Sequence, residues 1–464
     1  MEEVDLFEEL KKGVNYFENK VIKCNSKLVI ADYTIVLSFY NCVFENLIYF
    51  NSRDTDSKLQ IFFTHCSFKK LIKFDFNTLS VIQFSNIKEI VSITIRGNKI
   101  KSLDFDKTIL EKAIIRINIS DINEVLFLDC SFQNIEIRSK KAFRTKIFIE
   151  NFVADKLFVH NTYIIPISLN SFSNLIINSK LDFNNCKFDS IKFDKSKIKS
   201  GLTFNECEFT SLMSYKDCSE SCETNLLITN CTFKKSSYFD NSVFQSIDIR
   251  DTTFEEKVSF DSVKANAVNF SQIIFLGNAY FDNFKILNPF NNAFSITNKK
   301  RTYRTIKQEL QKLENRIDYN IFRVYELTMH KLEVKELLQN SKVSDIERSS
   351  LVKDKCILFL HQYASNFGTD WKKALTFVLC SAFTFYTILF MVENSNKEFD
   401  IYGFHNYIKG FFNYIMVTNF DNPLDNEDEL KFNYVPSYFI FILGKIFIAF
   451  GIYEMIQSFR KFRY

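Results

Sequence analysis

The chain has 464 residues, more than one hydrophobic core usually serves, so we expect at least two structural units. Phe occurs 54 times against 9 Gly and 4 Pro, which excludes collagen-like and disordered chains and favours bulky side chains in a regular array. Residues 1–300 carry 38 basic and 36 acidic side chains and the rest carry 21 and 19, or +2 for each part. Neither part has the charge of a nucleic-acid-binding or nucleic-acid-mimicking surface.

The N-terminal segment contains no basic stretch followed by an apolar one. Its sequence, MEEVDLFEELKKGVNYFENK, therefore predicts no secretory signal, and we expect the large N-terminal part to lie in the cytoplasm. Residues 1–20 are expected to cap the domain that follows. The 11 cysteines of the chain would be reduced in that compartment, so we expect no disulfide framework.

A five-residue repeat is clearest in the stretch LDFNNCKFDSIKFDKSKIKSGLTFNECEF. Within it Phe183, Phe188 and Phe193 are five residues apart, and the position two before each large residue is often small or aliphatic, as at Cys186. Five is the period of neither a helix nor a strand. Two inward positions in every five residues describe a chain that turns a corner every five residues.

On these residues the sequence resembles the pentapeptide-repeat proteins, strongly in residues 181–275 and more loosely in residues 25–180. The resemblance implies a right-handed, four-sided parallel β-helix, which we expect over residues 21–297, so the chain is mainly β. The usual Ala-Asp/Asn-Leu of the family is replaced here by Cys/Ser-x-Phe, which indicates a wide interior filled by Phe. Stacked coils of this kind bury one continuous core.

Six cysteines occupy the small inward position, and we interpret them as core residues that behave as small hydrophobes. They are Cys42, Cys66, Cys130, Cys186, Cys207 and Cys231. Metal ligation is the less favoured alternative, because no CxxC pair or Cys/His knot accompanies them. Cys218 and Cys222 form a close pair in DCSESCE, which we interpret as a loop rather than a redox or metal site. No nucleophile, phosphate loop or HExxH pattern appears, so we expect no enzyme, metal or cofactor.

Residues 298–370 are predicted to form a helical connector. Apolar residues recur there every three or four positions, which predicts a long amphipathic helix; they are Ile306, Leu310, Leu313, Ile317, Ile321, Val324 and Leu327. The helix either caps the open end of the β-helix, which we favour, or forms a coiled-coil seam between subunits. The segments YRTIKQEL, FRVYELTMHKLE and ASNFGTDWKKAL resemble the connector of membrane-anchored pentapeptide-repeat proteins from bacteria.

Residues 371–464 are predicted to form a two-span membrane domain. Ala374 to Val392 and Ser437 to Ile456 are each long and apolar enough to cross a bilayer core of about 30 Å. Basic residues precede the first span and follow the second, whereas residues 393–435 carry eight acidic and three basic side chains. This distribution predicts a multi-pass membrane protein with both termini in the cytoplasm. The resemblance to membrane-anchored pentapeptide-repeat proteins implies that the membrane is a bacterial inner membrane.

Between the spans, residues 404–424 are predicted to form a short apolar helix followed by a polar turn. The order of span, short helix, Thr-led turn and span resembles the two-span pore-loop channels of the potassium-channel type, in which Thr418 would open the filter. Phe420-Asp421-Asn422 replaces the Gly-Tyr-Gly of that filter, so potassium selectivity is not expected. The candidate pore residues are Thr418, Asn419, Phe420, Asp421 and Asp425. The alternative is an interfacial helix that lies on the membrane surface.

Three residues of the second span are further candidates. Lys445 is a charge inside an apolar helix, where it requires a partner, a cavity or access to water. Gly444 and Gly451 are seven residues apart and would allow close helix packing, or would act as a hinge in the channel resemblance.

Two functions follow from this sequence. The first is an oligomeric pore that conducts ions or permeabilises the membrane and is regulated by the cytoplasmic β-helix. The second is a non-conducting, membrane-anchored scaffold. The expected partners are the lipid bilayer, further copies of the chain, and an unknown cytoplasmic protein or ligand on the β-helix, with no nucleic acid among them.

Overall fold

The computed structural model describes residues 1–23, 28–29, 36–52, 58–166, 172–218, 223–340, 344–393, 404–424 and 431–460. Contacts divide the chain into two compact units, Met1–Asn298 and Lys299–Tyr464. The first unit is built of strands and the second of helices.

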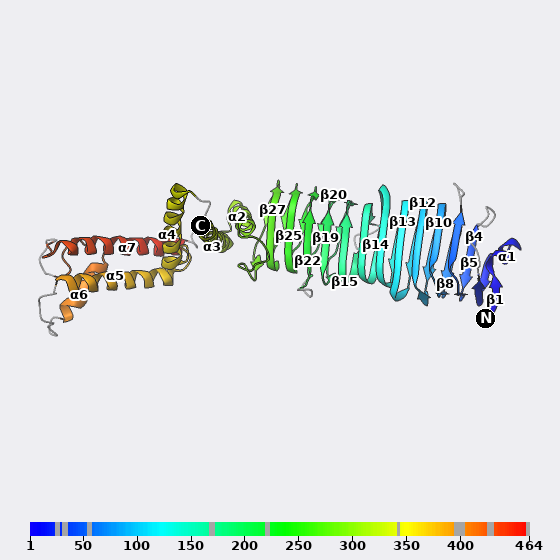
Figure 1. Cartoon of the computed structure of the whole chain (residues 1–464), viewed down its shortest axis with the longest axis horizontal. Helices are drawn as coiled ribbons and strands as arrows, with labels where there is room; N and C mark the ends of the chain where they lie inside the picture. The colour runs from blue at the N-terminus through cyan, green and yellow to red at the C-terminus, as the bar shows by residue number, and fades with distance from the viewer. Residues whose placement is uncertain are drawn as a thin grey trace. The chain divides into compact units, whose positions relative to one another are not determined.

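The first unit is a parallel β-solenoid of about 11 turns, as the sequence predicted. Figure 1 shows its strands stacked in chain order, from blue to green. Every pairing recorded among the described strands is parallel, so each turn adds its strands in register to the turn before, as in Phe183 and its partner Phe204. One sheet contains β1, β3, β6, β9 and β11, a second contains β17, β21, β24, β26 and β28, and the others form a third, larger sheet.

The strands of the first half are β1 (Glu2–Asp5), β2 (Tyr16–Glu18), β3 (Lys20–Lys23), β4 (Leu28–Val29), β5 (Val36–Tyr40), β6 (Val43–Phe44), β7 (Ile48–Ser52), β8 (Gln60–Thr64), β9 (Ser67–Phe68), β10 (Ile72–Ser85), β11 (Glu89–Ile90), β12 (Ser92–Asp106), β13 (Ile109–Leu128) and β14 (Ser131–Pro166). Those of the second half are β15 (Phe172–Asn184), β16 (Lys187–Phe188), β17 (Ile191–Lys192), β18 (Lys197–Ile198), β19 (Gly201–Asn205), β20 (Glu208–Phe209), β21 (Met213–Ser214), β22 (Asn225–Thr229), β23 (Thr232–Phe233), β24 (Ser237–Tyr238), β25 (Val243–Phe254), β26 (Val258–Ser259), β27 (Lys264–Phe275), β28 (Ala279–Tyr280) and β29 (Lys285–Ile286). A short helix, α1 (Leu6–Lys11), follows β1.

Ladders of stacked Phe rings fill the interior of the solenoid. Phe188, Phe209, Phe233 and Phe254 occupy one ladder, in which successive ring centroids are 4.7, 4.2 and 4.6 Å apart. Phe188 and Phe233 are fully buried. Stacked aromatic pairs contribute roughly 0.5–1.5 kcal/mol each beyond the burial of their area. The five-residue spacing therefore becomes a continuous aromatic core.

The buried cysteines share one role at the corners of the coils. Each follows a residue with positive φ, such as Asn41 (φ 47) before Cys42, and side chains such as Asn tolerate that left-handed conformation. The Sγ atom of Cys42 then lies 3.4 Å from two carbonyl oxygens, those of Phe17 and Tyr40, which share its single S–H donor. These thiols thus supply hydrogen-bond donors to backbone carbonyls at the buried corners, in addition to filling space as small hydrophobes.

Cys218 differs from its predicted place in a loop. It is buried, and its Sγ atom lies 3.4 Å from the carbonyl oxygens of Phe193 and Lys216, as at the other corners. Burial raises its thiol pKa to about 12, which keeps the thiol protonated and unreactive at neutral pH. Cys222, its partner in the sequence, lies outside the described residues.

The connector is interrupted where the sequence predicted one long helix. Helix α2 (Ile296–Lys312) ends before Glu314, which has a φ of 58°, and α3 (Arg316–Gln339) begins after Asn315, whose side chain caps it. Helix α4 (Asp345–Ser365) follows. The apolar period continued through the break and therefore gave no sign of it.

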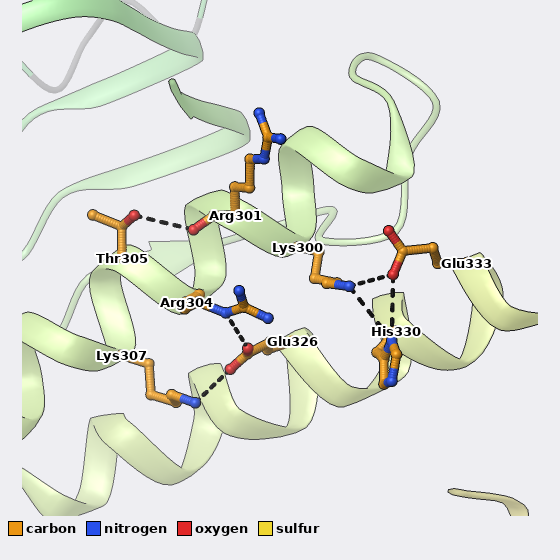
Figure 2. A network of polar contacts seen from close by, with 8 residues as sticks. All are labelled: Lys300, Arg301, Arg304, Thr305, Lys307, Glu326, His330 and Glu333. Carbon is orange, nitrogen blue, oxygen red and sulfur yellow. Dashed lines mark hydrogen bonds and ion pairs between the residues drawn. The ribbon is translucent and has the colours of Figure 1, made fainter. Parts of the chain in front are cut away.

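Polar contacts hold α2 against α3 (Figure 2). The carboxylate of Glu326 accepts from Arg304 Nε at 2.8 Å and from Lys307 Nζ at 2.5 Å. Lys300 pairs with Glu333 and lies 3.5 Å from His330 Nδ1. Burial raises the pKa of the Glu326 carboxyl, but Lys307 and Arg304 outweigh this effect and hold the pKa below its ordinary value.

Three helices complete the second unit: α5 (Trp371–Glu393), α6 (Phe404–Ile415) and α7 (Val435–Arg460). Two of them, α5 and α7, are long and apolar enough to cross a membrane, with mean hydropathies of 2.1 and 2.0. Only 28% and 33% of the residues in their most apolar stretches are buried within the chain, whereas a core helix of a soluble protein is mostly buried. Their exposed apolar surface is therefore suited to lipid.

Candidate functional site

The two apolar helices pack closely through small residues of α7. A Cβ atom at Gly451 would lie 2.6 Å from Val378 Cγ2 and 2.9 Å from Phe377 Cδ1 on α5. A Cβ atom at Gly444 would overlap the hydroxyl of Tyr414 on α6 and lie 2.8 Å from Phe385 Cβ. Both glycines thus serve packing within one chain, and a contact between subunits would need a different face of α7.

The short helix α6 is fixed to α5 near its first turn. The hydroxyl of Tyr386 donates to the carbonyl oxygen of Tyr407 at 2.9 Å, and the Phe390 and Tyr407 rings meet edge to face at 4.4 Å. A Cβ atom at Gly410 would overlap the Pro423 carbonyl and lie 2.5 Å from the Tyr386 hydroxyl. This contact requires Gly at position 410, because the returning chain and α5 both approach the helix there.

Lys445 of α7 fixes the other end of α6. Its ammonium group is buried and donates to the carbonyl oxygens of Tyr414 at 2.9 Å and of Met416 at 2.7 Å. The last carbonyls of a helix lack intrahelical partners and carry partial negative charge, so a cation stabilises them. The costly charge in the second span is therefore satisfied by the C-terminus of α6.

These contacts give the level of α6 along the two apolar helices. Lys445 lies eight residues after Ser437, or about 12 Å along α7 at 1.5 Å per residue. Phe390 lies three residues before the end of α5, and Phe383, which meets Phe411 at 6.4 Å, lies ten before it. Helix α6 thus runs inward along α5, from about 5 Å to about 15 Å from its end.

The chain returns along α7 after α6. The Phe420 ring lies 6.5 Å from that of Phe441, one turn before Lys445, and the Phe432 ring lies 5.0 Å from that of Tyr438. The segment that leads into α7 is then held by Glu393 at the end of α5, which accepts from the backbone nitrogens of Asn433 at 3.0 Å and Tyr434 at 3.3 Å.

The turn after α6 contains four of the five pore residues predicted from the sequence. Thr418, Phe420 and Asp421 are exposed, and the side chain of Asn419 accepts from Asp421 N at 2.8 Å. No residue from 404 to 424 has positive φ, unlike a filter built on glycines. The Asp421 carboxylate interacts electrostatically with Lys445. Asp425, the fifth residue, lies outside the described part of the chain.

Helix α6 leaves part of its apolar surface exposed. Ile408, Phe412 and Met416 are 43%, 58% and 58% exposed, whereas Phe411 and Ile415 pack against the apolar core of the helical unit. The Tyr414 side chain is buried, and its hydroxyl has no hydrogen-bond partner among the described residues. An open apolar groove of about 460 Å³ lies beside α6, lined by Phe383, Tyr386, Thr387, Phe390, Tyr407, Ile408 and Phe411.

Sequence reasoning missed two residues, Glu393 and Tyr386. Glu393 holds the segment that leads into α7, and Tyr386 holds α6. Their only signal was a carboxylate at the end of one span and a hydroxyl inside it. Among the described residues no group of three or more His, Cys, Asp or Glu side chains is arranged to hold a metal ion. Comparison of the chain with protein-family models, curated proteins and solved structures found no match.

Proposed function

We propose that the chain is an oligomeric membrane protein whose two apolar helices and re-entrant α6 form an ion-conducting or membrane-permeabilising pore. The observation that supports this proposal is the position of α6 along the two apolar helices. If Ser437 lies near one membrane surface, the Lys445 contact places the end of α6 about 12 Å below it. An interfacial helix lies within about 5–10 Å of the headgroup boundary. Irregular backbone at greater depth is tolerated only where protein covers it or where it lines a water-filled cavity.

Conduction further requires several copies, because two spans and a short helix do not enclose an aqueous path. The exposed stripe of Ile408, Phe412 and Met416 supplies apolar surface for a neighbouring copy. A ring of heterologous contacts that closes is the simplest arrangement. In such a ring the exposed Asp421 carboxylates would attract cations, and each Lys445 would weaken that attraction.

The β-solenoid is proposed as the sensor or assembly domain, and its Cys/Ser-x-Phe corners support its description as an irregular pentapeptide repeat. The proposal places the solenoid and both termini on the cytoplasmic side of a bacterial inner membrane, because Lys372, Lys373 and Arg460 flank the spans. It gives the protein no enzymatic activity, and the partner of the solenoid is a cytoplasmic protein or ligand.

A non-conducting membrane anchor for a binding scaffold is the second candidate, and one observation favours it. The two charged residues in the apolar part of α7, Lys445 and Glu454, are 5% and 0% exposed and have partners within the chain. Between Ser437 and Ile456 the helix therefore offers no charged side chain to an aqueous path.

Reconstitution of the full-length protein separates the two functions. The oligomeric state in detergent is measured first, and the reversal potential in planar bilayers under a KCl gradient follows. If the protein forms a pore, we expect a ring whose current is carried mainly by cations. The Asp421→Asn/Asp425→Asn variant should then show a smaller preference for cations. Glu336→Gln/Glu347→Gln, which removes two exposed connector charges, is the matched control. A stable monomer, or a ring that passes no current at any voltage or pH, would establish the scaffold instead.

A further inference from the structure

A cavity of about 550 Å³ lies where the end of α7 meets α2 and α3, and no part of the proposed pore uses it. Its lining is Leu310, Gln311, Glu314, Asn315, Arg316, Tyr319, Asn320, Arg323, Tyr453, Ile456, Gln457 and Arg460. The lining thus includes three arginines and one glutamate, and Arg316 adds its charge at the positive N-terminal end of α3. None of the ion pairs recorded among the described residues of the helical unit includes Arg323 or Arg460. The cavity has an excess of positive charge that an anion would balance.

The surface of α7 that leads to this cavity is apolar and exposed. Phe439, Ile446 and Tyr453 follow one another at seven-residue intervals, are 67%, 57% and 59% exposed, and point to the same side of the helix as Arg460. The stripe therefore runs along the candidate span and ends at the arginines. A phosphate with acyl chains matches both parts, whereas a free phosphate or nucleotide would use the arginines alone.

We propose that this cavity binds the headgroup of an anionic phospholipid, whose acyl chains lie along the exposed stripe of α7. Guanidinium groups recognise phosphate through paired hydrogen bonds. Arginines at the end of a span lie at the level where headgroups occur. The bound lipid ties the connector to the second span, because Arg323 belongs to α3 and Arg460 to α7. The site depends on α7 crossing a membrane and is independent of pore formation.

The test uses delipidated full-length protein in detergent, with phosphatidylglycerol and phosphatidylcholine as the probes. Native mass spectrometry of the wild type with an equimolar mixture should show preferential retention of phosphatidylglycerol. The single variants Arg323→Gln and Arg460→Gln should each bind phosphatidylglycerol about fivefold more weakly than the wild type. The double variant should bind it about 25-fold more weakly. Arg348→Gln/Lys353→Gln, which removes two exposed charges of α4, should bind as the wild type does.

Equal retention of the two lipids by the wild type would overturn the proposal even if a variant failed to fold. So would unchanged affinity in a monodisperse double variant. Inorganic phosphate and glycerol phosphate should not raise the melting temperature at concentrations where phosphatidylglycerol does. An equal rise with inorganic phosphate would make the cavity a free-anion site and would overturn the lipid assignment. A protein that passes no current but retains phosphatidylglycerol would refute the pore and would still support this lipid site.

Discussion

The Nδ1 atom of His361 on α4 lies 2.9 Å from Oε1 of Glu454, a fully buried carboxylate of α7. The two groups form an ion pair when the imidazole is protonated, and their geometry is not that of an aligned hydrogen bond, since Glu454 Oε1 has no hydrogen-bond partner among the described residues. The other carboxylate oxygen accepts from the hydroxyl of Ser365, which in turn accepts from Gly368 N at 2.7 Å. The carboxylate thus fixes the turn between α4 and α5 to the end of the second apolar helix.

Removal of the imidazole should destabilise the helical unit. We expect His361→Ala to lower its free energy of unfolding by about 2–3 kcal/mol, because the carboxylate stays buried without its partner. The value lies below the range for fully buried pairs, since the His361 side chain is 36% exposed. Thermal unfolding in detergent is the measurement, and Lys355→Ala on the exposed face of α4 is the control. If the two variants unfold together, the contact contributes nothing.

Truncation of one ring in the Phe ladder should be costly. Phe188 is fully buried and its ring stacks on Phe209 at 4.7 Å. Phe188→Ala should lower the free energy of unfolding of the solenoid by roughly 3–5 kcal/mol, because it removes the ring and leaves a cavity. Leu276→Ala is the control, since Leu276 is 69% exposed and should change stability by less than about 0.5 kcal/mol. Denaturant titration of the full-length protein compares them.

The repeat made the solenoid predictable, because the five-residue spacing of large side chains marks each inward position in the sequence. Phe183 and Phe204 are separated by one coil in the sequence and pair in one register in the structure. The long strands β13 and β14 were not predictable in the same way. Their inward residues, such as Ile115 and Ile117, alternate by two as in any strand, and the five-residue signature is lost.

The candidate site was only half predictable. The sequence showed that Lys445 needed a partner, since a charge in an apolar helix is costly. It did not show that the partners are the carbonyls of Tyr414 and Met416, which lie 31 and 29 residues away. Backbone acceptors carry no side-chain signal. Their availability depends on where α6 ends and how the chain returns, and both are set by tertiary packing.

The connector should lose stability in acid. The Glu326 carboxyl has a pKa below its ordinary value of 4.5 in the folded protein. Its contribution is therefore fully present above about pH 4.5 and is lost as the pH falls through the folded pKa. Glu326→Gln should remove this part of the pH dependence, and Glu333, also lowered, should leave a remainder. Thermal unfolding from pH 7 to pH 3 measures it, with the exposed Glu336→Gln as control. An identical pH profile in both variants would contradict the assignment.

The proposed orientation can be tested by labelling. A membrane-impermeant maleimide should reach a cysteine placed at Asn426 in intact cells and should reach native Cys356 only after permeabilisation, because Cys356 is exposed on α4. Ser458 is unsuitable as the inner probe, since it is 1% exposed and its hydroxyl donates to the Glu454 carbonyl. Cys380→Ser removes the other exposed thiol described in the helical unit. Labelling of Cys356 in intact cells would reverse the orientation.

The packing of α6 on α7 predicts that a second substitution can restore stability lost through a first one. In Gly444→Ala the new methyl group would overlap the Tyr414 hydroxyl, so we expect α6 to shift and the helical unit to lose about 1–3 kcal/mol of stability. That hydroxyl is buried and has no hydrogen-bond partner among the described residues. Tyr414→Phe alone should therefore cost little, because it removes an unsatisfied polar group.

The double variant Gly444→Ala/Tyr414→Phe should recover part of the loss, since the ring then ends one atom further from the methyl group. Unfolding of the four proteins in the same detergent gives the coupling energy between the two positions, which should be at least about 0.5 kcal/mol in favour of the double variant. Gly451→Ala provides the matched control: its methyl group would meet Val378 and Phe377 on α5, so Tyr414→Phe should not rescue it. Additive effects of Gly444→Ala and Tyr414→Phe would mean that α6 does not pack on this part of α7. The depth argument for a re-entrant helix would then lose its basis.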